Sequence, residues 1–311
     1  MKLQDIMILT HIKGLGSVNL QKLINYCQQN QINNLQTLRD NDLTKVVSQR
    51  LAQAIYMYLD TDIQALYTNI NSTLKRYAQD GISCIDITDD RYPEILRNST
   101  NPPVILYYKG DITLLSTPCI ATIGTRQNTH IGEQITQKTV TFLVQNGFTI
   151  VSGLAKGIDE ISHLTTLSLQ GKTIAVVPLI DEIYPASNKQ LAQDIVANGG
   201  LLISEVKPNS RFNGGLLVKR DRIQSGLSKA VFVFETTLDG GSMYATNDAL
   251  KLNRLVFTPD IYSLPTTYQE LKQVEGIKKL IDTNQSIAYT SSDYDKIKTF
   301  ITSQPKQHSL F

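Results

Sequence analysis

The chain has 311 residues, of which 41% are hydrophobic, and its formal net charge is +2. This length exceeds one typical domain of about 100–200 residues, so we expect two domains. So small a charge does not by itself indicate a nucleic-acid-binding protein, and no segment is apolar for the roughly 18 residues that a membrane helix needs. The three cysteines form no CxxC pair and residues 1–6 show no export signal, so we expect a cytoplasmic protein without membrane association.

Residues 1–72 carry apolar side chains at helical spacing and predict a small all-helical domain of the helix-hairpin-helix or SAM-like kind. Within it, Gly14-Leu15-Gly16 separates two short amphipathic segments. Such a turn either offers backbone N–H groups to a phosphate or only connects two helices, and the sequence leaves both open. Residues 73–118 predict a connecting segment that begins with a short helical piece at 74–79 and is then extended, with strands at 82–87 and 104–108, because prolines at 93, 102 and 103 stop helices there.

Short apolar strands alternate with helices over residues 119–290. The expected strands of the central part are Cys119–Ile123, Phe148–Val151, Thr173–Val177, Leu201–Ser204, Ala230–Glu235 and Leu255–Thr258. This alternation predicts an α/β fold with a doubly wound, Rossmann-like, mostly parallel sheet. A helix around 268–281 and a strand at 286–289 follow, and residues 291–311 are expected to be a short tail with one helix near 293–301 and no winged-helix domain.

Three glycine-containing turns each follow an expected strand and precede an expected helix. They are Gly124-Thr125-Arg126, the segment Ser152–Asp159 and Asp239-Gly240-Gly241-Ser242. Glycine lets backbone N–H groups approach an anion, and a helix N-terminus adds partial positive charge. Because turns after parallel strands meet at one edge of the sheet, the sequence predicts a phosphate-binding edge. Asp159 is expected to cap the helix that follows it.

A basic segment lies further along the chain and contains Lys219, Arg220 and Arg222. These three side chains cannot share one side of a helix, so we expect some to face phosphate and one to pair with Asp221 or Glu205. A solvated charged face is the alternative. His163 follows Asp159 by four residues. We expect its side chain to pack inside the fold rather than to form an acid–imidazole pair with Asp159. Walker, GxGxxG, HExxH and GxSxG patterns are absent, which leaves ATP hydrolysis, dinucleotide binding and metal or serine hydrolase chemistry without support.

Several of these motifs, in this order, resemble the DNA-processing protein A (DprA/Smf) family. The matching segments are Tyr92–Leu96, Asn101–Tyr107, Ile123–Arg126, Ser152–Asp159, His163, Ile183–Pro185, Ile203–Glu205, Lys219–Ile223 and Gly241–Ser242. The resemblance implies a non-catalytic, homodimeric protein that binds single-stranded DNA through its phosphates, without sequence preference. It also implies that the protein assists loading of the RecA recombinase in natural transformation or recombination. No cofactor and no metal are implied.

The resemblance and the three turns together give the expected DNA- or phosphate-binding residues. These are Gly124, Thr125, Arg126, Ser152, Gly153, Lys156, Gly157, Lys219, Arg220, Arg222, Gly241 and Ser242. The chain departs from the family pattern at Leu217, where an aromatic residue is usual, and at Asp221, where asparagine is usual. Asp221 either adds a negative charge to the site or orients the arginines beside it.

Two other classes of function stay open. A nucleotide-binding protein or phosphoribohydrolase-type enzyme could use the same fold, but Met243, Tyr244 and Asn247 replace the glycine, threonine and glutamate of that enzyme motif. A diverged relative that binds protein partners instead of DNA is the other alternative, supported by Leu217 and Asp221.

Overall fold

The computed structural model describes residues 1–303, which form two compact units. The first unit contains residues 1–89 and 103–106, and the second contains residues 90–102 and the described residues from 107 onward. None of the described helices is both long and apolar enough to span a membrane.

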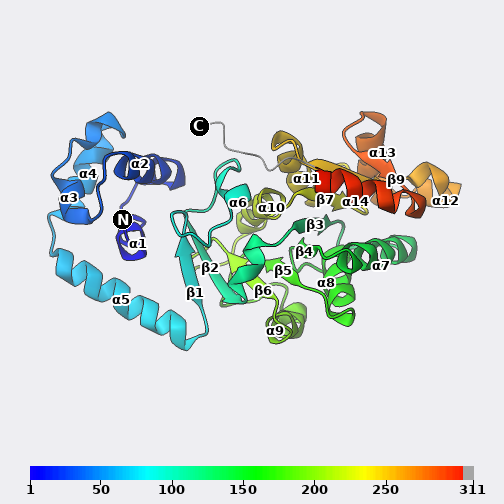
Figure 1. Ribbon diagram of the computed structural model, residues 1–311, viewed down its shortest axis with the longest axis horizontal. Helices are drawn as coiled ribbons and strands as arrows, with labels where there is room; N and C mark the ends of the chain where they lie inside the picture. Colours follow the sequence, from blue (N-terminus) through cyan, green and yellow to red (C-terminus); the bar gives the residue numbers. More distant parts are fainter. Residues whose placement is uncertain (304–311) are drawn as a thin grey trace. The chain divides into compact units, whose positions relative to one another are not determined.

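The first unit is helical except for one strand and the first residues of a second (Figure 1). Its elements are α1 (Leu3–Leu9), α2 (Ser17–Gln29), α3 (Leu35–Arg39), η1 (Leu43–Lys45), α4 (Gln49–Leu59), α5 (Ile63–Gln79) and β1 (Ser83–Asp86). The segment Gly14-Leu15-Gly16 lies between α1 and α2, as the sequence predicts. The domain boundary expected after residue 72 falls inside α5, because the amphipathic pattern of this helix continues to Gln79.

The second unit contains a sheet with helices on both faces. Its strands are β2 (Ile105–Gly110, whose first residues belong to the first unit), β3 (Cys119–Ile123), β4 (Thr149–Ser152), β5 (Thr173–Val176), β6 (Leu201–Ser204), β7 (Ala230–Val233), β8 (Leu255–Pro259) and β9 (Ile287–Tyr289). Its α-helices are α6 (Glu94–Arg97), α7 (His130–Gln145), α8 (Ile158–Ser168), α9 (Lys189–Ala197), α10 (Gly215–Leu227), α11 (Ser242–Lys251), α12 (Thr266–Gln269), α13 (Glu275–Asp282) and α14 (Tyr294–Ser303).

The strands are ordered β1-β2-β6-β5-β4-β3-β7-β8-β9. All pairs from β6 to β9 in this order are parallel, whereas β2 pairs antiparallel with β6. The predicted doubly wound, mostly parallel α/β sheet is therefore confirmed.

Consecutive residues of the central strand β3 point to opposite faces of the sheet. Ile120 packs with Val140 of α7 and Ile301 of α14 on one face, whereas Ala121 packs with Ala245 of α11 on the other. Both faces are covered, which explains why the central strands are fully buried and read as uninterrupted apolar runs.

The strand order reverses at β3, because the chain adds β4 and β5 on one side of it and β7 and β8 on the other. In a doubly wound sheet the loops that follow the two strands at such a switch point separate and leave a crevice at their carboxyl ends. Here these loops are 124–129 after β3 and 234–241 after β7.

The single helix expected around 268–281 is wrong. The chain forms α12, a 3-10 turn η5 (Lys272–Val274) and then α13. Gly276 explains the break, since its N–H donates to Thr236 O (2.9 Å) and a Cβ there would lie 2.6 Å from the Thr236 side chain. The backbone of α13 therefore approaches the loop after β7 closely. The helix expected near 293–301 is confirmed as α14, and residues 304–311 of the expected tail lie outside the described residues.

Candidate functional site

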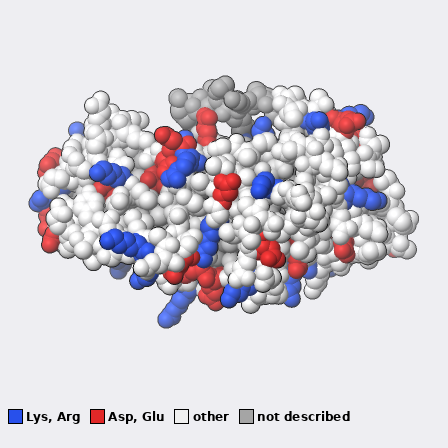
Figure 2. Space-filling view, turned by 60° about the horizontal axis from the view of Figure 1, so that its bottom comes forward, with Lys and Arg blue, Asp and Glu red and all other residues white. Residues whose placement is uncertain are grey.

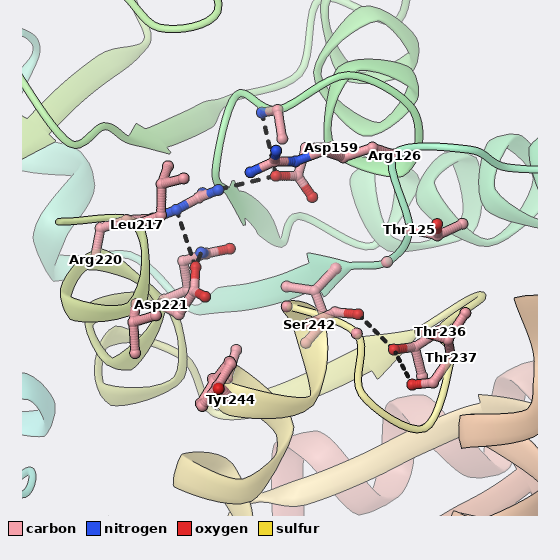
Figure 3. Close-up of a pocket in the computed structure, with 18 of the residues that line it drawn as sticks. Thr125, Arg126, Asp159, Leu217, Arg220, Asp221, Thr236, Thr237, Ser242 and Tyr244 are labelled. Atoms are coloured by element: carbon pink, nitrogen blue, oxygen red, sulfur yellow. Dashed lines mark hydrogen bonds and ion pairs between the residues drawn. The ribbon is translucent and has the colours of Figure 1, made fainter. Parts of the chain in front are cut away.

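A pocket of about 520 Å³ lies at the switch point of the sheet (Figure 3). Its lining comes from the loop after β3, the loop after β7, the start of α11, one side of α10 and the turn before α8. Two of the three glycine turns singled out in the sequence, 124–126 and 239–242, therefore contribute to one pocket. The third contributes Ala155 and Asp159.

Arg220 and two carboxylates form a buried cluster in one wall of this pocket (Figure 3). Arg220 Nε lies 2.9 Å from Asp221 Oδ1, and Arg220 Nη1 lies 3.6 Å from Asp159 Oδ2. Asp159 Oδ2 also accepts a hydrogen bond from the Ala155 N–H at 3.2 Å. The helix cap expected from Asp159 is thus wrong, because its carboxylate turns back to Ala155 and Arg220, and α8 has no side-chain cap.

Burial controls the protonation of the two carboxyl groups. Loss of water raises the pKa of Asp221 to about 6, although the nearby Arg220 charge opposes this. Burial likewise raises the pKa of Asp159, opposed by the charges of Arg220 and Arg126. The Arg220 guanidinium therefore interacts with both carboxylates, and these offset its positive charge in the absence of a ligand.

Gly153 makes room for the Arg220 guanidinium. A Cβ at position 153 would lie 1.1 Å from Arg220 Nη1 and 2.1 Å from Arg220 Cζ, so any larger residue would have to displace the guanidinium. Ser152 is fully buried and donates to Thr122 O at 2.6 Å. Both residues were expected to hold phosphate. Their recorded contacts instead give them a role in building the wall behind the pocket.

Arg222 is held by a second ion pair. Its Nη1 and Nη2 donate to the two carboxylate oxygens of Glu205 at 2.7 and 2.5 Å, and its Nε donates to Asn101 O at 3.1 Å. This is the pairing with Glu205 that the sequence offered for one of the basic residues. Because Arg220 pairs with Asp221, two of the three cations of this segment are already matched.

The helix after the first turn has its N-terminus occupied by the protein itself. Glu235, in the loop just after β7, accepts from the N–H and the hydroxyl of Thr129, at 2.9 and 2.7 Å, and from the Tyr268 hydroxyl at 2.9 Å. Gly132 is needed for this contact, because a Cβ there would lie 2.3 Å from the Glu235 carboxyl carbon. The start of α7 is therefore not available to an external phosphate.

The start of α11 faces the pocket and has no such occupant among the described residues. Gly241 precedes this ten-residue helix, and no side chain caps it. The first N–H groups of a helix lack intrahelical partners and carry partial positive charge, which favours an anion. Gly240 and Ser242 also line the pocket, with Ser242 Oγ donating to Thr236 Oγ1 at 2.7 Å.

Three predicted cations remain exposed: Arg126, Lys156 and Lys219. Within residues 1–303 none of them makes an ion pair. Arg126 lines the pocket beside Asp159, whereas the two lysines are sequence neighbours of lining residues (Figure 3). On the face shown in Figure 2, basic and acidic side chains are interspersed without one continuous basic patch.

The structure places half of the predicted phosphate-binding residues in the pocket lining. These are Gly124, Thr125, Arg126, Arg220, Gly241 and Ser242. The other six, Ser152, Gly153, Lys156, Gly157, Lys219 and Arg222, lie outside the lining. Their assignment as phosphate ligands stays a prediction. Gln224 and Tyr244 also line the pocket and were missed, because neither belongs to a glycine turn or a basic cluster.

Fold and pocket together define a Rossmann-like α/β protein with an anion-compatible pocket at the switch point of its sheet. The sequence matches the profile of the DNA recombination-mediator protein A family over residues 83–301. The chain belongs to this family, as its motifs indicate.

Curated relatives carry the same family names. A DNA processing protein DprA of Bacillus subtilis is 37% identical over 64% of this chain and 67% of its own length. Protein Smf of Synechocystis is 36% identical over 67% of this chain and 52% of its own length. A DprA of Streptococcus pneumoniae is 39% identical over 55% of this chain and 60% of its own length. The match thus spans about half to two thirds of these relatives.

Two solved structures share the fold. DprA from Streptococcus pneumoniae superposes with a TM-score of 0.79 over 96% of this chain and 98% of its own, at 27% identity. DNA processing protein A from Helicobacter pylori superposes with a TM-score of 0.60 over 71% of this chain and 95% of its own, at 30% identity. The latter structure was described for its single-stranded DNA binding mode.

Proposed function

We propose that this protein binds single-stranded DNA through its phosphates, without sequence preference in this backbone contact. The observation that carries the proposal is the open start of α11 in the switch-point pocket, with Arg126 on the same lining. The single-stranded DNA binding of the Helicobacter pylori relative supports the same ligand. Exposed Lys156 and Lys219 flank the lining and provide further charges for a polyanion.

The wider role that we propose is that of a recombination mediator. We propose that the protein acts as a homodimer in the cytoplasm and assists RecA loading in natural transformation or recombination, a role that its match to the recombination-mediator family supports. We further propose that it is not an enzyme. Both carboxyl groups in the pocket lining, Asp159 and Asp221, pair with Arg220, so neither is arranged as a free general base.

Fluorescence anisotropy with a labelled dT20 strand at 50 and 200 mM salt tests the binding. Affinity should fall steeply with salt, because each contacted phosphate of a single strand adds about −0.7 to the slope of log K against log salt. Arg126→Ala, Lys156→Ala and Lys219→Ala should each weaken binding about three- to tenfold and reduce that slope. Lys138→Ala is the control, since Lys138 is an exposed cation on α7 that does not line the pocket. Salt-insensitive binding, or equal effects of all four variants, would contradict the proposal.

A nucleotide-binding function is the second candidate, because a pocket of about 520 Å³ has the size of a small-molecule site. Incubation with nucleoside monophosphates distinguishes a phosphoribohydrolase by the release of free base. We expect no release, since Asn247 stands at the position of that enzyme's glutamate. Release that is abolished by Asp159→Asn would show that the protein is an enzyme.

A further inference from the structure

Two aromatic side chains stack on each other at the surface, outside the pocket lining. Tyr184 lies in the loop after β5 and Phe212 in the loop after β6, and their ring centroids are 4.3 Å apart with the ring planes 25° from parallel. Although the rings cover each other, the two residues remain 42% and 36% exposed. The stacked rings of Phe232 and Phe257, in contrast, are fully buried in the core. The Tyr184–Phe212 pair therefore offers aromatic surface to a ligand.

Hydrogen bonds fix the loops that carry this pair. The Asn209 N–H donates to Asp181 Oδ2 at 2.5 Å and so links the loop after β6 to the loop after β5. Asn188, which is buried and follows Tyr184 by four residues, donates through Nδ2 to Ala155 O at 3.3 Å. Ala155 lines the pocket. The loop that carries Tyr184 is thus bonded directly to the turn at the pocket.

The pair also adjoins the pocket through the other loop. β5 and β6 are parallel neighbours, so the loops that follow them lie at the same carboxyl edge of the sheet as the pocket. Phe212 precedes the pocket-lining Gly214 by two residues, which places the two Cα atoms at most about 7 Å apart. A single strand that occupies the pocket can therefore reach these rings with a neighbouring base.

The charges around the pair favour contact with bases over contact with phosphates alone. Arg211 directly precedes Phe212 and is exposed, as is Lys156 in the turn after β4, and neither makes an ion pair within residues 1–303. The exposed Asp181 and Glu182 of the loop after β5 balance these two cations. Net attraction for a phosphate is therefore weak beside the pair, and the rings provide the larger part of any affinity there.

Aromatic side chains bind single strands because bases stack on them, and every base has a π face for this contact. We propose that the Tyr184–Phe212 pair stacks a base of single-stranded DNA whose phosphates are held at the pocket. This inference rests on the proposed function and adds a base contact to it. Stacking releases no counterion, so it should raise affinity without changing the salt dependence of binding.

A fluorescent reporter can be placed in the pair itself. The chain contains no tryptophan, so Phe212→Trp introduces a single one. Its emission should be quenched by dT20 but not by a 20-mer of abasic residues, which keeps the phosphates and lacks the bases. Phe300→Trp is the matched control, because Phe300 is an exposed aromatic residue of α14 outside the pocket lining. Its emission should not change with either strand.

Anisotropy measures how much the stacking contributes. Phe212→Ala should weaken binding of dT20 about tenfold, which corresponds to about 1.4 kcal/mol, and should leave the salt slope at its wild-type value. Binding of the abasic strand should stay unchanged in this variant. Lys156→Ala, in contrast, should weaken binding of both strands and lower the salt slope. Circular dichroism shows whether each variant is folded, and the quenching experiment decides the question if Phe212→Ala is not.

Other results overturn the proposal. Wild-type affinity of Phe212→Ala for dT20 would show that the pair serves another partner, such as a protein, or none. Equal losses for dT20 and the abasic strand would show that the pair only shapes the loops beside the phosphate site. An unquenched Phe212→Trp protein that binds dT20 would show that no base reaches the rings. In these three cases DNA binding itself stands, whereas a wild-type protein that binds neither strand refutes the proposed function.

Discussion

Gly153→Ala tests whether this glycine makes room for a buried arginine or holds a phosphate. The added Cβ would lie 1.1 Å from Arg220 Nη1, which is far inside contact distance, so the guanidinium must leave. Its departure strands Asp159 and Asp221 in the wall of the pocket without their shared positive charge. The substitution therefore acts on the stability of the fold before it acts on any ligand.

The expected loss follows from the burial of the cluster. Removing one partner of a buried ion pair costs about 3–5 kcal/mol, because the other charge is left without compensation. For a unit of this size, that corresponds to a fall in melting temperature of about 10 °C. Thermal or urea unfolding followed by circular dichroism measures it at pH 7.5. At pH 5 the loss should be smaller, because burial already raises the pKa values of Asp159 and Asp221 and the stranded carboxyls can protonate.

Gly241→Ala is the matched control at the same pocket. A Cβ there meets nothing within 4 Å, and the backbone has right-handed helical angles of φ −54° and ψ −37°. Its unfolding free energy should change by less than about 0.5 kcal/mol. Equal stability of the Gly153→Ala and Gly241→Ala proteins at pH 7.5 would refute the reasoning. A Gly153→Ala protein of normal stability that no longer binds dT20 would show instead that Gly153 approaches phosphate.

Three further predictions concern charged groups. Folding raises the pKa of Asp221 to about 6 from an ordinary value of 3.8, so the protonated carboxyl contributes stability below about pH 4 that is lost as pH rises through 6. Asp221→Asn should therefore gain about 2 kcal/mol relative to wild type between pH 4 and 7.5, and a constant difference in urea unfolding would contradict this. Arg222→Ala should lower the unfolding free energy by about 2–3 kcal/mol because Glu205 keeps its charge, with Glu205→Gln in the same background restoring part of it. Glu235→Gln should cost about 1–3 kcal/mol, since its amide nitrogen would face a donor such as the Tyr268 hydroxyl; an unchanged melting curve would argue against that contact.

Much of the fold could be predicted because its signals are local. Strands such as Cys119–Ile123 and Leu201–Ser204 are buried on both faces, so they appear in the sequence as unbroken apolar runs with the observed bounds. The sequence also predicted that the turns after β3 and β7 lie close together, because parallel strands bring their carboxyl ends to one edge of the sheet. The helix expected at 268–281 failed because its break depends on the close approach of Gly276 to Thr236, which no local pattern records.

The roles of the individual site residues were harder to predict because they depend on partners that are distant in sequence. Arg222 pairs with Glu205 across 17 positions, and Thr129 donates to Glu235 across 106 positions. A glycine turn before a helix looks the same in sequence whether its N–H groups are open, as at α11, or occupied, as at α7. Gln224 carried no signal, because a glutamine on a helix is usually a surface residue.

These pairings change what a basic sequence segment implies about DNA binding. Lys219, Arg220 and Arg222 look alike as charges, yet two of them are matched by Asp221 and Glu205. A phosphate that approached Arg220 would have to compete with two carboxylates that already share it, so this arginine positions the wall of the pocket more readily than it binds a strand. The exposed cations Arg126, Lys156 and Lys219 can contact phosphate without breaking an existing pair. We therefore expect substitutions of these three residues to weaken DNA binding. Substitutions of Gly153, Arg220 or Arg222 should instead lower the stability of the fold.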